Sequence, residues 1–183
     1  KIEEDIRREL TKILDKLRKL LEKAKKNVED IERSSRDLKR RVDETIEKIK
    51  DELRKLERDG DTDEMERRLR KKLREVEEEL KKYEEELREN LKRSEEELRK
   101  VKKDLEDELR ELEDRLEKIR DRIDEEVLER AERELRRVMK EVEKVLREIE
   151  ELHRRVAETS KRVIDELRRL LEKVFKEFED AVR

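Results

Sequence analysis

Residues 65–119 read MERRLRKKLREVEEELKKYEEELRENLKRSEEELRKVKKDLEDELRELEDRLEKI and decide the fold of the chain. From Met65 to Ile119, apolar or small residues recur in steps of 4, 4, 3, 4 and 3, and this five-step pattern occurs three times. Five such positions in 18 residues give a period of 3.6, the pitch of a straight α-helix. We therefore predict one long helix whose narrow apolar stripe stays on one face, without the supercoil that a seven-residue repeat imposes.

The same arithmetic holds on both sides of this stretch. A first stripe runs from Ile2 to Leu56 and a third from Val127 to Ala181, each with the same five steps three times over. We predict helices at about residues 2–58, 63–120 and 124–182. Their equal lengths and short connections predict an all-α, antiparallel up-down-up three-helix bundle with long, nearly straight helices. Residues 1–183 are expected to form this single elongated bundle.

The first connection is marked by the one glycine of the chain. Gly60 stands in the segment Asp59-Gly60-Asp61-Thr62-Asp63, where it can take the left-handed conformation that follows many helix C-termini. Asp63 is predicted to be the N-cap of the second helix, with Glu66 completing a capping box.

The second connection has neither glycine nor proline, and a phase shift reveals it. The third stripe starts eight residues after Ile119, which places it about 80° out of phase on a helix of this pitch. Asp124 is a suitable N-cap, and Ile123 can pack on Leu128 across it. We predict a turn near residues 121–124; the alternative is one unbroken helix from residue 63 to residue 183.

The composition excludes several classes of partner. Charged residues make up 63% of the chain, but 56 basic and 59 acidic residues are mixed along every segment, so no nucleic acid or membrane partner is expected. There is no cysteine for disulfides or thiolate metal sites. No apolar run approaches the roughly 20 residues that span a bilayer. We expect a soluble protein.

The chain consists of nine 18-residue units with uniform Leu/Ile/Val stripes and a Glu/Lys/Arg surface, and it lacks Gln, Trp, Cys and Pro. In these features it resembles a computationally (de novo) designed, parametrically generated untwisted three-helix bundle. The resemblance implies a thermostable structural protein or rigid scaffold, not an enzyme, with no cofactor and no natural partner. It implies a synthetic protein with no native localisation, cytoplasmic when expressed recombinantly. A monomer is favoured over a homo-oligomer.

The central unit of each helix departs from the repeat. Polar residues replace aliphatic ones there, and turn geometry places Ser94 level with Asn27 and His153, and Ser35 level with Ser160. We predict a buried polar layer formed by Asn27, Ser35, Ser94, His153 and Ser160. Tyr83 is predicted to pack in the core with its hydroxyl at the rim.

Three interpretations of this layer stay open. A hydrogen-bonded layer penalises slipped registers, which would leave its groups unpaired. A designed binding module could have a small site around Ala24, Ser94 and His153. Ser94 and His153 have the residue types for acyl transfer, yet we predict no catalytic residue because mid-helix backbone N–H groups cannot form an oxyanion hole. A single histidine also predicts no metal site.

The third predicted helix carries a second apolar stripe beside the first, and its candidate self-association residues are Leu128, Met139, Leu146, Ile164 and Phe175. It indicates either the more buried side of an asymmetric bundle or a surface that pairs with a second copy, as in an oligomerising coiled-coil rod.

Small-angle X-ray scattering with absolute mass calibration tests this architecture. Three helices of about 57 residues packed side by side predict a monomer mass and a maximum dimension of roughly 90 Å. A dimer mass, or a dimension near 180 Å, would contradict the monomer or the second turn.

Overall fold

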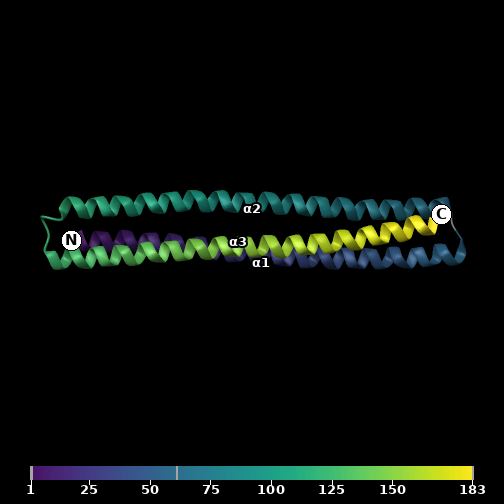
Figure 1. The fold of residues 1–183 in the computed structure, drawn as a ribbon, viewed down its shortest axis with the longest axis horizontal. Coiled ribbons are helices and arrows are strands. Elements are labelled where there is room, and N and C mark those ends of the chain that lie inside the picture. The colour runs from purple at the N-terminus through teal and green to yellow at the C-terminus, as the bar shows by residue number, and fades with distance from the viewer. Residues whose placement is uncertain (1, 61, 183) are drawn as a thin grey trace. The chain divides into compact units, whose positions relative to one another are not determined.

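Three long α-helices make up the part of the chain that the structure, a computed structural model, describes: residues 2–60 and 62–182. Helix α1 covers Ile2–Asp59, α2 covers Asp63–Ile119 and α3 covers Glu125–Val182 (Figure 1). The predicted all-α class of three helices packed against one another is confirmed. The sequence favours it because no proline and no interior glycine interrupts any of the three periodic segments.

Gly60 ends α1 as predicted. Its φ of 91° lies in the left-handed region, and its backbone N–H donates to the carbonyl oxygen of Leu56 at 3.1 Å. This conformation satisfies one of the carbonyl groups that a helix C-terminus leaves unpaired. The predicted connection also contained Asp61, which lies outside the described residues.

The N-cap of α2 is Thr62, so the prediction of Asp63 was wrong by one residue. The Thr62 hydroxyl accepts a hydrogen bond from the backbone N–H of Met65 at 3.2 Å, and the Thr62 carbonyl accepts one from Glu66 at 3.1 Å. Asp63 is already helical, with its carboxylate in the first turn. There it is favoured by the positive end of the helix dipole, which explains why both residues fit this terminus.

The second connection breaks the chain between Ile119 and Glu125, so the alternative of one unbroken helix was wrong. The Arg122 N–H donates to the Ile119 carbonyl at 2.9 Å, which closes a turn. The Asp124 carbonyl accepts from Leu128 at 3.0 Å, which puts Asp124 in the predicted N-cap position. Ile123 and Leu128 pack in one hydrophobic cluster.

The helices pack in two compact units. Unit 1 comprises Lys1–Val28 and Lys92–Arg154, and unit 2 comprises Glu29–Leu91 and Arg155–Arg183. Each unit therefore takes a part of all three helices. The expectation that residues 1–183 form one domain stays a prediction, which the scattering measurement tests.

Unit 1 has a core to which all three helices contribute their apolar stripes. The fully buried large side chains in this cluster are Leu10, Ile13, Leu17, Leu105, Leu112 and Ile149. Burying one such side chain stabilises a fold by about 1.5–3 kcal/mol relative to leaving it exposed.

Unit 2 has its own core with the same three-helix composition. Its fully buried large side chains are Leu38, Ile46, Ile49, Leu69, Leu73 and Leu80, and α3 adds residues such as Val174 and Phe178. The α2 stripe is less deeply buried at its centre than at its ends. Tyr83, Leu87 and Leu91 are only half-buried in unit 2, as are Ser94 and Val101 in unit 1.

Ion pairs between α1 and α2 show their antiparallel direction within each unit. Residue numbers fall along α2 as they rise along α1, and the nitrogen–oxygen distances lie between 2.5 and 3.0 Å. The pairs are Glu9–Arg115, Lys16–Glu108 and Lys23–Glu97 in unit 1, and Arg41–Glu79 and Glu52–Lys72 in unit 2. Because these side chains are solvent-accessible, each pair contributes only about 0–1 kcal/mol.

The capping assignment gives a test. Thr62→Ala should lower the free energy of unfolding by about 1 kcal/mol, because the Met65 N–H loses its acceptor at the start of α2. The matched control is Thr11→Ala inside α1, where the hydroxyl donates to the Arg7 carbonyl of its own helix. The control should stay within about 0.5 kcal/mol of the parent in chemical denaturation. Equal losses in both variants would contradict the cap.

Candidate functional site

One polar group of the predicted layer lies in unit 1 and joins α1 to α2. The Asn27 amide nitrogen Nδ2 donates to Ser94 Oγ at 3.1 Å, and both residues are half-buried. The helical stripes position them, because Ser94 occupies a stripe position and Asn27 lies beside the stripe residue Val28. The structure thus brings together two of the five predicted residues here.

His153 belongs to the same unit, on α3, and is 7% exposed. Among the residues that the structure describes, its Nδ1 atom is buried and has no hydrogen-bond partner. Burial lowers the pKa of the imidazole below its ordinary 6.5, and the negative charge of Glu95 opposes this only in part. Near pH 7, burial therefore favours the neutral form of His153.

The arrangement of unit 1 does not prepare Ser94 as a nucleophile. A serine is activated by a hydrogen-bonded base that takes its proton. The hydrogen bond recorded for Ser94 Oγ comes instead from the Asn27 amide, which donates and is not a base. His153 Nδ1 is not bonded to Ser94.

The other polar group lies in unit 2 and links all three helices. Ser35 of α1 is 5% exposed and Ser160 of α3 is 1% exposed, and their hydroxyl oxygens are 3.4 Å apart. The Tyr83 hydroxyl of α2 lies 2.5 Å from Ser35 Oγ and donates to the Ile31 carbonyl at 3.4 Å. Three polar side chains from three helices thus form one hydrogen-bonded group.

Tyr83 is the member of this group that sequence reasoning missed, since its hydroxyl was expected at the rim. Burial raises the pKa of the phenol above its ordinary value, more than the Ser35 hydrogen bond lowers it. The phenol is therefore neutral near pH 7 and can donate. The sequence contained a signal for this role. Tyr83 belongs to the central unit of its helix and carries a hydroxyl where the units before and after it have Met65 and Val101.

The second stripe of α3 lies mostly inside the units. Leu128 and Leu146 are buried in the core of unit 1, and Met139 packs against it half-buried. In unit 2, Ile164 is buried, and Phe175 is half-buried against the core. These side chains have much of their surface covered by the chain itself.

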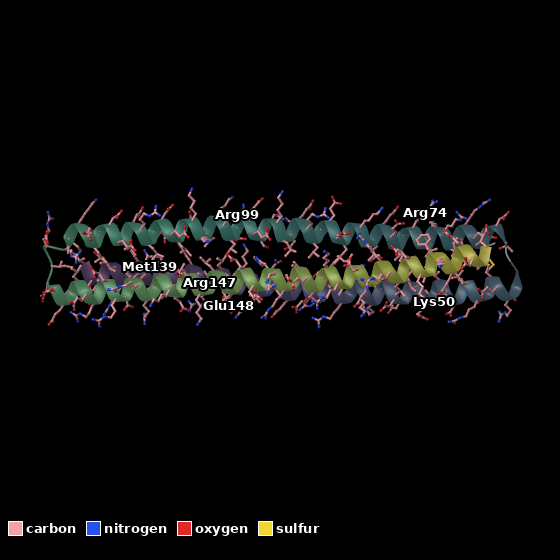
Figure 2. All side chains as sticks on the ribbon, in the orientation of Figure 1. Lys50, Arg74, Arg99, Met139, Arg147 and Glu148 are labelled. Carbon is pink, nitrogen blue, oxygen red and sulfur yellow. The ribbon has the colours of Figure 1, made fainter. Side chains whose placement is uncertain are left out.

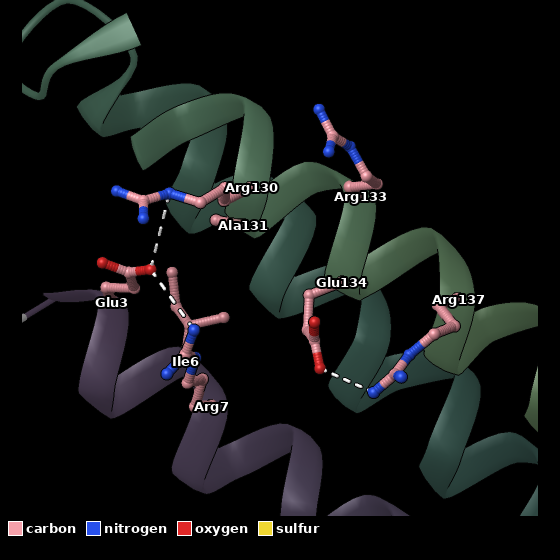
Figure 3. A pocket seen from close by; sticks show the side chains of 8 residues that line it. All are labelled: Glu3, Ile6, Arg7, Arg130, Ala131, Arg133, Glu134 and Arg137. Carbon is pink, nitrogen blue, oxygen red and sulfur yellow. Dashed lines mark hydrogen bonds and ion pairs between the residues drawn. The ribbon is translucent and has the colours of Figure 1, made fainter. Parts of the chain in front are cut away.

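Charged side chains form the outside of the helices, where Arg74, Arg99, Arg147 and Glu148 are exposed (Figure 2). One groove of unit 1, of about 220 Å³, lies between α1 and α3 (Figure 3). Its floor includes the buried residues Ile6 and Ala131.

Ion pairs cover this groove. The Glu3 carboxylate lies 3.7 Å from Arg7 and 4.0 Å from Arg130, and Glu134 pairs with Arg137 at 2.7 Å (Figure 3). Arginines and glutamates at this surface therefore neutralise one another locally.

Within residues 2–60 and 62–182, no group of three or more His, Cys, Asp or Glu side chains is arranged to hold a metal ion. None of the described helical segments combines the length and apolarity needed to cross a membrane.

A double-mutant cycle tests the hydrogen-bonded group of unit 2. Tyr83→Phe and Ser35→Ala should each lower the free energy of unfolding by about 0.5–1.5 kcal/mol, because each removes the hydrogen bond between the two hydroxyls. The double variant should lose less than the two single losses added together, since both changes remove the same hydrogen bond. Ser34→Ala, at the exposed neighbouring position, is the control and should show no coupling to Tyr83→Phe. A purely additive Ser35 cycle would contradict the hydrogen bond.

Comparison with protein-family models and with curated proteins gives no match. Among solved structures, the chain is similar to one described as a computationally designed three helix bundle, with 20% sequence identity and a TM-score of 0.46. The similarity covers 99% of this chain and 84% of that chain.

Proposed function

We propose that this chain is a designed structural protein, a scaffold whose role is to hold three helices in a defined arrangement, and that it carries out no reaction. One observation carries the proposal. In each unit the periodic stripes of all three helices meet in one core. Among the described residues, the one exposed large hydrophobic side chain is Ile2, at 41% exposure.

The regularity of the sequence supports a designed origin. Every helix repeats the same 18-residue apolar pattern three times, and almost all surface positions hold Glu, Asp, Lys or Arg. Idealised helices, uniform aliphatic cores and mixed-charge surfaces are the devices by which a designed sequence specifies one structure.

The polar groups have a natural role in such a scaffold. A stripe of interchangeable Leu, Ile and Val residues would tolerate sliding of one helix along another by a full repeat. Moving Ser35 away from Tyr83 would take a hydrogen bond from a buried hydroxyl, at about 1–3 kcal/mol, and moving Asn27 away from Ser94 would break a half-buried hydrogen bond. The two groups therefore favour one register in their respective units.

The ion pairs between α1 and α2 act in the same direction. Each contributes little to stability, but a shifted register would separate these oppositely charged partners. Lys16 and Lys23, for example, face Glu108 and Glu97. The exposed charges thus select among arrangements that the apolar stripes alone would allow.

A variant with aliphatic residues at the polar positions tests this role. It combines Ser35→Leu, Ser94→Val, His153→Leu and Ser160→Val, which copy equivalent positions of the repeat, with Tyr83→Met to offset the added volume. For a scaffold, the denaturation midpoint should stay the same or rise, because polar groups leave the core. The fold should become less unique, with additional or broadened amide resonances in NMR spectra.

The rival hypothesis is a small-molecule site around Ala24, Ser94 and His153. It predicts that the parent shows saturable binding in a fragment screen monitored by NMR, and that this variant loses it. A sharp single set of resonances for the variant, together with such a loss of binding, would overturn the scaffold proposal.

A further inference from the structure

His153 is the one ionisable side chain buried in the core of either unit among the described residues. It occupies a stripe position of α3 whose equivalents one repeat before and after are Leu135 and Leu171. Ile149 and Val156, one turn before and one turn after it on the inner face of α3, are buried and apolar. A titratable ring thus stands where the pattern calls for an aliphatic residue.

The polar groups that the sequence places level with this ring are already engaged. Asn27 donates to Ser94, and Glu95, the next residue of α2, acts on the imidazole through its charge while its side chain is exposed. On α1, the stripe residues Ala24 and Val28 are uncharged, and the Lys23 ammonium lies 2.5 Å from Glu97 of α2.

On α3 itself, the adjacent Arg154 is paired with Glu151. Arg154 donates two hydrogen bonds to the Glu151 carboxylate, at 2.5 and 3.1 Å. No carboxylate or carbonyl accepts a hydrogen bond from His153 Nδ1 among the described residues. Protonation would therefore place an N–H and a positive charge in the core without an acceptor for that N–H.

We propose that His153 is an acid-sensitive switch, whose protonation loosens the packing of α3 in unit 1. At neutral pH the imidazole is uncharged and packs in the core among apolar side chains. In acid, its charge is stabilised only when the ring reaches water, so the proton binds preferentially to an opened form. This property goes beyond a scaffold role, because it makes the arrangement of the helices depend on pH.

Because folding and proton binding by His153 are linked, the folded state loses stability in acid. The folded chain has a lowered histidine pKa and the unfolded chain has the ordinary value of 6.5, so the unfolded chain binds the proton first as the pH falls. The stability due to the neutral ring is complete above pH 6.5 and is lost as the pH falls through the lower pKa of the folded state.

The experiment has two readouts on the whole chain. Because the sequence has a single histidine, its ring resonance in an NMR titration is assigned without further work. Its midpoint should lie below 6.5. In guanidinium chloride, which screens surface charges, the unfolding equilibrium constant should rise up to about 30-fold between about pH 7.5 and pH 5.

Two variants isolate the histidine from the many carboxylates. His153→Leu copies the residue at the equivalent repeat positions, and His153→Gln keeps a polar side chain that cannot gain a proton. Both should lack the parent's rise in the unfolding constant over this pH range. A ring midpoint at or above 6.5, or the same acid dependence in both variants as in the parent, would overturn the proposal.

Discussion

A narrow apolar stripe is the constraint on which the rest of this structure depends. Hydrophobic residues make up 31% of the chain, and each helix gathers them in one stripe that it buries against the other two helices. Three helices do this with a core only a few side chains wide. The period of 3.6 then matters more than the identity of any residue, because it keeps each stripe facing inward along the helix.

Such a core stabilises the bundle but does little to select one alignment of the helices. Leu, Ile and Val in adjacent layers are nearly equivalent, so the free energy of burial hardly distinguishes one alignment of the helices from another. Directional interactions supply the difference. The hydrogen bonds of Ser35 with Tyr83 and Ser160, and of Asn27 with Ser94, require particular partners at particular heights. The two groups are not equally complete, since the hydroxyls of unit 2 satisfy one another, whereas unit 1 contains a ring nitrogen without a partner.

This difference between the units gives each polar group a distinct chemical character. Hydroxyl groups keep the same charge over the physiological pH range, so the group of unit 2 acts only as a fixed determinant of packing. Imidazole changes its charge in that range, and burial makes the change costly. His153, at a position where the repeat has leucine, thus makes the stability of a fold that otherwise depends on hydrophobic burial depend on pH as well.

The sequence by itself determined the class of fold, favoured three helices over two, and placed the ends of the helices to within one residue. These features follow from local properties of the sequence, which can be read without knowing the partner helix. They are the periodicity, the left-handed preference of Gly60 and the phase shift before Val127. It also indicated Ser94 beside Asn27 and Ser35 beside Ser160, because short connections set the relative heights of the helices.

Only the tertiary structure decided how the polar atoms are paired. The Tyr83 hydroxyl turns inward to Ser35 because the small serines on α1 and α3 leave room beside it, and no spacing in the sequence encodes that direction. The cap at Thr62 and the unpaired nitrogen of His153 likewise depend on the distances and angles between donors and acceptors in the folded chain. Hydrogen bonds are directional and hydrophobic burial is not, so a pattern of residue types predicts the core and leaves its polar contacts to the folded chain.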